Sequence, residues 1–148
     1  MRRAAVAGLM MWMLATPFAL SSGNRETVEE LKARVARTSV ADRPPLYLRI
    51  AEMQLDAARN FYLAGENEKA QSTLADVIAF AELDRDSAIQ SHKHEKQSEI
   101  AIRKMVRKLG DMKHTVSRED QEQIQKTIDR LEQVRDDLLA AMFPGGKK

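Results

Sequence analysis

The chain of 148 residues contains no cysteine. Disulfides, thiolate metal sites, thiol nucleophiles and lipid attachment to a cysteine are therefore excluded. Aromatic residues make up only 5% of the sequence, and the one tryptophan lies at position 12. A domain formed by the remaining residues has few large side chains with which to build its core.

Proline and glycine are also scarce, with four and six residues respectively. Beyond residue 22 they stand only at Pro44, Pro45, Pro144, Gly23, Gly65, Gly110, Gly145 and Gly146. Because these residue types mark the boundaries of regular elements, the intervals between them are open to long helices. Those intervals are rich in Ala, Glu, Lys, Gln, Arg and Leu, which predicts an all-α protein.

The first 21 residues have the pattern of a secretory signal peptide. Two arginines follow the initial methionine, residues 4–20 are largely apolar, and Ala19 and Ser21 are small residues suited to cleavage before Ser22. The alternative is an uncleaved anchor, although 17 helical residues span about 25 Å and a hydrocarbon core about 30 Å. The pattern predicts a periplasmic or secreted bacterial protein, with no stable membrane insertion after cleavage.

Removal of the signal peptide changes the charge of the protein. The full chain has 24 basic and 22 acidic side chains, and two of the basic ones lie in the signal peptide. The remaining chain carries no formal net charge. A general attraction to nucleic acid is therefore not expected.

Residues 22–143 are predicted to form one helical domain, followed by a disordered tail over residues 144–148. The predicted helices span residues 25–38, 43–64, 67–114 and 118–142, with Asn24, Asp42 and Ser117 as caps for the first, second and last.

The interval 67–114 decides the predicted shape. Apolar residues at both of its ends share one heptad register, as Ala70, Val77, Met105 and Met112 show, whereas Asp84, Ser91 and Ser98 hold the same position in the middle. The shared register predicts one long, partly coiled-coil-like central helix that two helical hairpins share, with helix 43–64 against its first half and helix 118–142 against its second half, in an elongated rod. A break near residues 84–91, which would allow a compact bundle, remains the alternative.

Charge is distributed unevenly over the second half of the chain. Residues 92–118 contain eight basic and three acidic side chains, whereas residues 119–137 contain three and seven. The short connection near residue 115 predicts antiparallel neighbours, which would neutralise each other. The alternative is a polyanion-binding strip formed by Lys93, Lys96, Arg103, Lys104, Arg107 and Lys108.

The turn at Gly65 carries a family resemblance. Phe61 precedes the glycine by four residues, Ala70 follows it by five, and Leu74 and Val77 continue the pattern. Residues 57–82 therefore resemble the central hairpin of a tetratricopeptide repeat. The resemblance implies a helical hairpin; it occurs once, so the peptide-binding surface of tandem arrays is not implied.

The sequence contains no catalytic, cofactor-binding or metal-binding constellation. His92 and His94 point in different directions on a helix, His114 has no partner in sequence, and His92 with Glu95 or Glu99 would give only a lone pair of ligands. Methionines at apolar positions, Met53, Met105, Met112 and Met142, favour core packing over copper binding.

Two functions remain open for a protein of this kind. The first is a non-enzymatic interaction or scaffold protein of the bacterial envelope, which binds another protein and needs no cofactor. Self-association is compatible with this function. The alternative is a periplasmic holdase-type chaperone or polyanion binder that uses the basic distal half of the long helix.

Overall fold

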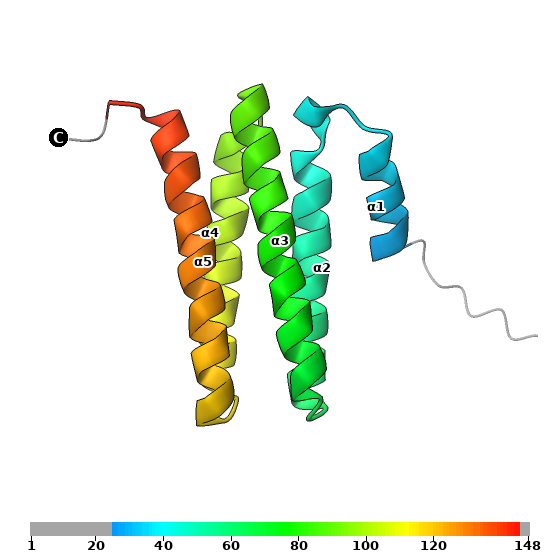
Figure 1. Ribbon diagram of the computed structural model, residues 1–148, viewed down its shortest axis with the longest axis vertical. Coiled ribbons are helices and arrows are strands. Elements are labelled where there is room, and N and C mark those ends of the chain that lie inside the picture. Colours follow the sequence, from blue (N-terminus) through cyan, green and yellow to red (C-terminus); the bar gives the residue numbers. More distant parts are fainter. Residues whose placement is uncertain (1–24, 146–148) are drawn as a thin grey trace, which may run out of the picture.

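A computed structural model describes residues 25–145, so residues 1–24 and 146–148 lie outside the described part (Figure 1). The predicted signal peptide, the predicted cap at Asn24 and the last three residues of the predicted tail fall outside it. Pro144 and Gly145 form a turn. Within the described residues all regular structure is helical, which confirms the all-α prediction.

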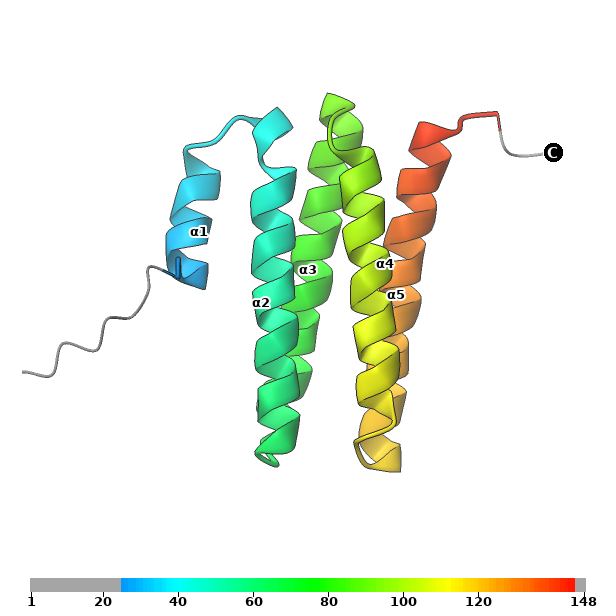
Figure 2. The ribbon, with the colours of Figure 1, turned by 180° about the vertical axis from the view of Figure 1, so that it is seen from behind.

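Five α-helices and one 3-10 turn make up the fold of residues 25–145. They are α1 (Val28–Ala36), the turn Val40–Asp42, α2 (Pro44–Leu63), α3 (Asn67–Ser91), α4 (Glu95–Lys113) and α5 (Arg118–Met142). Helices α2 to α5 form a four-helix bundle of two antiparallel hairpins, α2 with α3 and α4 with α5 (Figure 1). The hairpins meet mainly where α3 packs against α5, and α1 lies at the outer edge beside α2 (Figure 2).

One apolar core joins the four long helices. Its buried members include Leu55 from α2, Leu74 from α3, Ile102 from α4 and Leu131 from α5. Short connections place consecutive helices antiparallel and side by side. The apolar stripe of each amphipathic helix then packs against that of the next helix.

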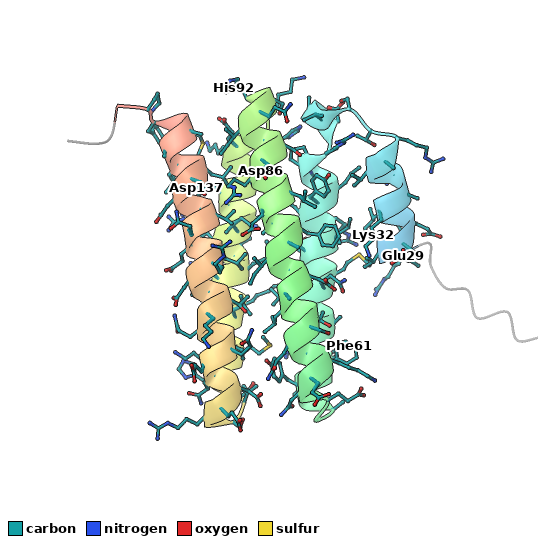
Figure 3. All side chains as sticks on the ribbon, in the orientation of Figure 1. Glu29, Lys32, Phe61, Asp86, His92 and Asp137 are labelled. Atoms are coloured by element: carbon teal, nitrogen blue, oxygen red, sulfur yellow. The ribbon has the colours of Figure 1, made fainter. Side chains whose placement is uncertain are left out.

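A second, smaller cluster attaches α1 to the bundle. Leu31 and Val35 of α1 pack with Leu46, Tyr47 and Ile50 of α2. The ammonium group of Lys32 adds a contact with α3, since it lies 5.7 Å from the centroid of the Phe80 ring, and Figure 3 shows Lys32 extending from α1 toward the bundle.

The predicted helix boundaries hold best for the last helix. Ser117 caps α5 as predicted, and its side chain accepts a hydrogen bond from the backbone of Asp120. Helix α1 begins three residues later than predicted, because Thr27 and Glu30 form a capping box that stops it. The prediction of Asp42 as the cap of α2 was wrong: Asp42 lies in the 3-10 turn, where its carboxylate accepts a hydrogen bond from Ser39.

The prediction of one long helix over residues 67–114, and with it the elongated rod, was wrong. Helix α3 ends at Ser91 and α4 begins at Glu95, immediately after the window predicted for a break. His92 and His94 both have left-handed backbone conformations, with φ of 54° and 66°, and they reverse the chain at one end of the bundle (Figure 3). Histidine enters this conformation more readily than bulky or β-branched residues, so no glycine is needed.

Burial of apolar surface explains why the chain turns back. A straight helix would leave the stripes around Leu74 and Ile102 on separate hairpins, each with a thin core. The reversal places both stripes in one core, where Leu74 and Ile102 are fully buried. Apolar area removed from water is the dominant favourable contribution, and the bundle removes more of it than a rod.

The turn between α2 and α3 takes the predicted hairpin form. Gly65 has φ of 74°, and the backbone N–H of Glu66 donates to the carbonyl of Phe61 at 2.9 Å. Ala70 is fully buried, which lets α3 approach α2 closely. The hairpin is thereby confirmed, and its relationship to tetratricopeptide repeats stays a prediction.

Replacing Gly65 by valine should lower the free energy of unfolding by about 1–2 kcal/mol, because a β-branched residue is strained at a positive φ. Gly110 is the matched control: it lies inside α4 with open space around it, and Gly110→Ala should stabilise by about 0.5–1 kcal/mol. Urea denaturation of both variants measures the two effects. Equal stability of Gly65→Val and the wild type would contradict the left-handed turn.

Candidate functional site

The polar residues of the predicted long helix are brought together inside the bundle. Asp84 of α3 and Ser98 of α4 are both fully buried, and the Ser98 hydroxyl donates to Asp84 Oδ1 at 2.7 Å. The other carboxyl oxygen, Oδ2, is buried and has no hydrogen-bond partner among residues 25–145. Burial raises the pKa of Asp84 from an ordinary value of 3.8 to about 7, although the hydrogen bond from Ser98 acts to lower it.

A second buried carboxylate joins α4 to α5. Glu99 is 7% exposed, and its Oε1 accepts a hydrogen bond from Arg135 Nε at 2.6 Å. Arg103, one turn further along α4, lies 3.7 Å from Oε2. The hydrogen bond to Glu99 holds the pKa of Arg135 above its usual value, so the guanidinium stays charged.

Further ion pairs join α5 to α3. Arg85 of α3 donates to Asp137 at 3.0 Å, and Arg130 of α5 pairs with Glu82 of α3. The same Arg85 guanidinium also binds Asp86, at 2.9 Å, and Figure 3 labels Asp86 on α3 and Asp137 on α5.

The prediction that the basic residues of α4 are neutralised by the acidic residues of α5 was wrong. The ion pair between the two helices has the opposite polarity, with Glu99 on α4 and Arg135 on α5. Among residues 25–145, no basic side chain of α4 lies within ion-pair distance of an acidic side chain of α5; Lys113 instead donates to the amide oxygen of Gln125. The core stripes decide this outcome, because they set which side of each helix faces its neighbour.

Two exposed ridges of opposite charge result. The basic ridge of α4 consists of Lys96, Arg103, Lys104, Arg107 and Lys108, and exposed Lys93 precedes it in the turn. The acidic ridge of α5 consists of Glu122, Asp129, Glu132 and Asp136. The two ridges lie on neighbouring helices, because α4 and α5 pack side by side as an antiparallel hairpin (Figure 2).

A shallow hollow of about 280 Å³ lies between α2 and α4, toward the C-terminal end of each helix. It is lined by Leu55, Asp56, Arg59, Lys108, Asp111, Met112 and Thr115. Lys108 and Asp56 lie 3.7 Å apart across it. This ion pair links the two helices, so part of the lining serves the fold.

A second hollow of about 200 Å³ lies beside the first, and its lining includes Tyr62 and Asp120. Burial, and then the nearby Asp120 carboxylate, raise the pKa of Tyr62. Asp120 itself is satisfied by hydrogen bonds from Asn67 at 2.9 Å and Ser117 at 2.8 Å.

In the described part of the chain, no three His, Asp or Glu side chains gather to hold a metal ion. His92 is exposed, and its Nδ1 lies 3.7 Å from Glu95. Of the methionines, Met105 and Met112 are buried in the core, as their positions predicted.

Comparison with protein-family models, with curated proteins and with solved structures finds no match to this chain. The candidate site therefore rests on the arrangement of its own residues. None of the helices within residues 25–145 combines the length and the apolar character needed to cross a membrane.

Sequence reasoning missed the contact of Asp84 with Ser98, although a signal for it was present. Both residues are polar, yet both occupy the heptad position that holds Ala70 and Val77 in α3 and Met105 and Met112 in α4. A polar residue at a core position is explained by a second one that faces it, and only a reversed chain lets these two meet.

Proposed function

We propose that this chain is an exported, non-enzymatic interaction protein of the bacterial envelope, and that the surface formed by α4 and α5 is where it binds its partner. The proposal of export rests on the signal-peptide pattern of residues 1–21. The proposal of a non-enzymatic role rests on the lack of a catalytic, cofactor-binding or metal-binding constellation in the sequence. The observation that carries the docking surface is the basic ridge. Its lysines and arginines are left without acidic partners on α5, although seven acidic side chains lie on that helix.

The remaining surfaces support this choice by contrast. The outer part of α1 carries charge of both signs close together, as in the pairs of Lys32 with Glu29 and of Arg34 with Glu26. Opposite charges that are paired within the chain offer little to a partner. Of the basic ridge, Arg103 and Lys108 are paired, whereas Lys96, Lys104 and Arg107 have no ion pair with another residue of 25–145 and can attract a surface of the other sign.

Site-specific crosslinking tests the proposal. A photo-crosslinking residue at Lys104, in protein exported by its host, should give an adduct of one defined mass with a protein. The same residue at Ser72, which is exposed on α3, is the control and should give none. The recovered protein should begin at or near Ser22. Identical adduct patterns from Lys104 and Ser72 would contradict the proposal that the surface of α4 and α5 binds the partner.

A second function, a periplasmic polyanion binder or holdase, is favoured by the same basic ridge. A polyanion binder would show polyphosphate affinity that falls steeply with salt, because each neutralised phosphate releases counterions. The holdase form has less support, since Met105 and Met112 are buried and offer no apolar surface to a client. Salt-dependent polyphosphate binding without a protein adduct at Lys104 would favour this second function.

A further inference from the structure

The charged surface of α4 and α5 is complementary to itself. Lys96, Arg103 and Arg107 recur at intervals of seven and four residues, so they share one side of α4. Asp129, Glu132 and Asp136 recur at intervals of three and four, so they share one side of α5. Any second copy of the chain presents the same two stripes.

Two hydrogen bonds give the register between the stripes. Glu99 accepts from Arg135 near one end of the hairpin, and Lys113 donates to Gln125 near the other. Between these two hydrogen bonds, Arg103 is level with Glu132, and Arg107 with Asp129, along the axis of the hairpin. Basic and acidic residues therefore stand level with each other along the whole surface.

We propose that the partner bound by this surface is a second copy of the chain, related by a two-fold axis parallel to the helices. This inference rests on the proposed docking surface and names its occupant. An axis in that direction lays α4 of each copy on α5 of the other and keeps the heights equal, so opposite charges meet twice. A two-fold axis across the helices would lay the basic ridge on another basic ridge, which like-charge repulsion disfavours.

The size of the surface fits a weak dimer. Nineteen residues of α4 span about 28 Å, and two helices 8–10 Å apart present a strip about 20 Å wide. Both copies together would bury about 1,100 Å², which is near the lower limit for a specific interface. Ile100 and Leu139 are half-buried near one end of the hairpin and add a small apolar contribution.

Charge exchange tests the dimer. Lys96, Arg107, Glu132 and Asp136 have no ion pair or hydrogen bond with other described residues, so reversing them leaves the internal contacts intact. Lys96→Glu with Arg107→Glu should weaken self-association about tenfold or more, and Glu132→Lys with Asp136→Lys should do the same. All four substitutions in one chain should restore it, because the ridges are then exchanged. An equimolar mixture of the two double variants should form a heterodimer.

Sedimentation equilibrium of the whole mature chain provides the measurement. The wild type should be a monomer and dimer mixture at low salt and shift toward monomer at high salt, because exposed charges are screened. Arg37→Glu with Arg49→Glu is the matched control: it changes the net charge by the same amount at exposed positions outside α4 and α5, and it should leave the dimer unchanged.

Three outcomes would overturn the dimer: a wild type that stays monomeric at all salt concentrations, double variants that associate as well as the wild type, or a fourfold variant that is not restored. If the wild type is monomeric and Lys104 still crosslinks to a different envelope protein, the dimer fails and the proposed function stands. If the wild type is monomeric and Lys104 crosslinks to no protein, both the dimer and the proposed docking surface fail.

Discussion

The stability of the wild-type protein relative to an Asp84→Asn variant should fall by about 2–4 kcal/mol as the pH is raised from 4 to 8. The pKa of Asp84 is raised to about 7 in the folded protein, against an ordinary value of 3.8 that the unfolded chain retains. Between these two values the folded protein holds a proton that the unfolded chain has lost. The stabilisation of the folded state by protonated Asp84 is therefore complete below pH 4, and it is lost as the pH rises to 7.

Asparagine is the informative replacement because it is neutral at every pH. Its side-chain oxygen can still accept the hydrogen bond that Ser98 now donates at 2.7 Å. Denaturant unfolding at a series of pH values measures the difference between wild type and variant, and linear extrapolation gives its free energy. Asp76→Asn is the control on the same helix, since Asp76 is exposed. Parallel pH profiles for wild type and Asp84→Asn would show that Asp84 titrates normally.

Arg135→Ala should destabilise the protein by about 2–3 kcal/mol, because it removes the main partner of a buried carboxylate. Glu99 is 7% exposed and would keep only Arg103, at 3.7 Å. Glu99→Gln should cost less, about 1 kcal/mol, because the amide oxygen can still accept from Arg135. The side chain of Arg135 is 34% exposed and also reaches solvent.

The two substitutions should not be additive. With Glu99→Gln in place no buried charge remains, so adding Arg135→Ala should cost less than it does in the wild type. Arg130→Ala is the control, since Arg130 is 59% exposed and its pair with Glu82 is at the surface, where the loss should stay below about 1 kcal/mol. Thermal and denaturant unfolding of the four variants measure these effects. Equal losses for Arg135→Ala and Arg130→Ala would contradict the buried character of the Glu99 pair.

The sequence by itself determined the local structure of the described chain. Spacing of apolar residues predicted the stripes that the structure buries, from Leu74 in α3 to Leu131 in α5. Ser117 predicted the start of α5, and Gly65 predicted the turn between α2 and α3, where φ is positive. These features depend on neighbours within a few residues, so local sequence is enough to specify them.

The prediction of one long helix failed because the local sequence allows both a straight helix and a reversal of the chain. The heptad register from Ala70 to Met112 is compatible with one straight helix, and nothing between Gly65 and Gly110 is a strong helix breaker. Yet the chain reverses at His92 and His94. Propensity alone does not choose between these alternatives, because left-handed residues cost only about 1–2 kcal/mol each.

Tertiary structure decided the rest: the bundle in place of a rod, the contact of Asp84 with Ser98, and the pairing of Glu99 with Arg135. Each of these joins residues 14 or more positions apart, and each exists only after the apolar stripes of four helices have met. The same packing turns the basic side of α4 and the acidic side of α5 outward. The gain from burying Leu74 and Ile102 in one core exceeds both the cost of the turn and the attraction between exposed charges, which is a few tenths of a kcal/mol per pair.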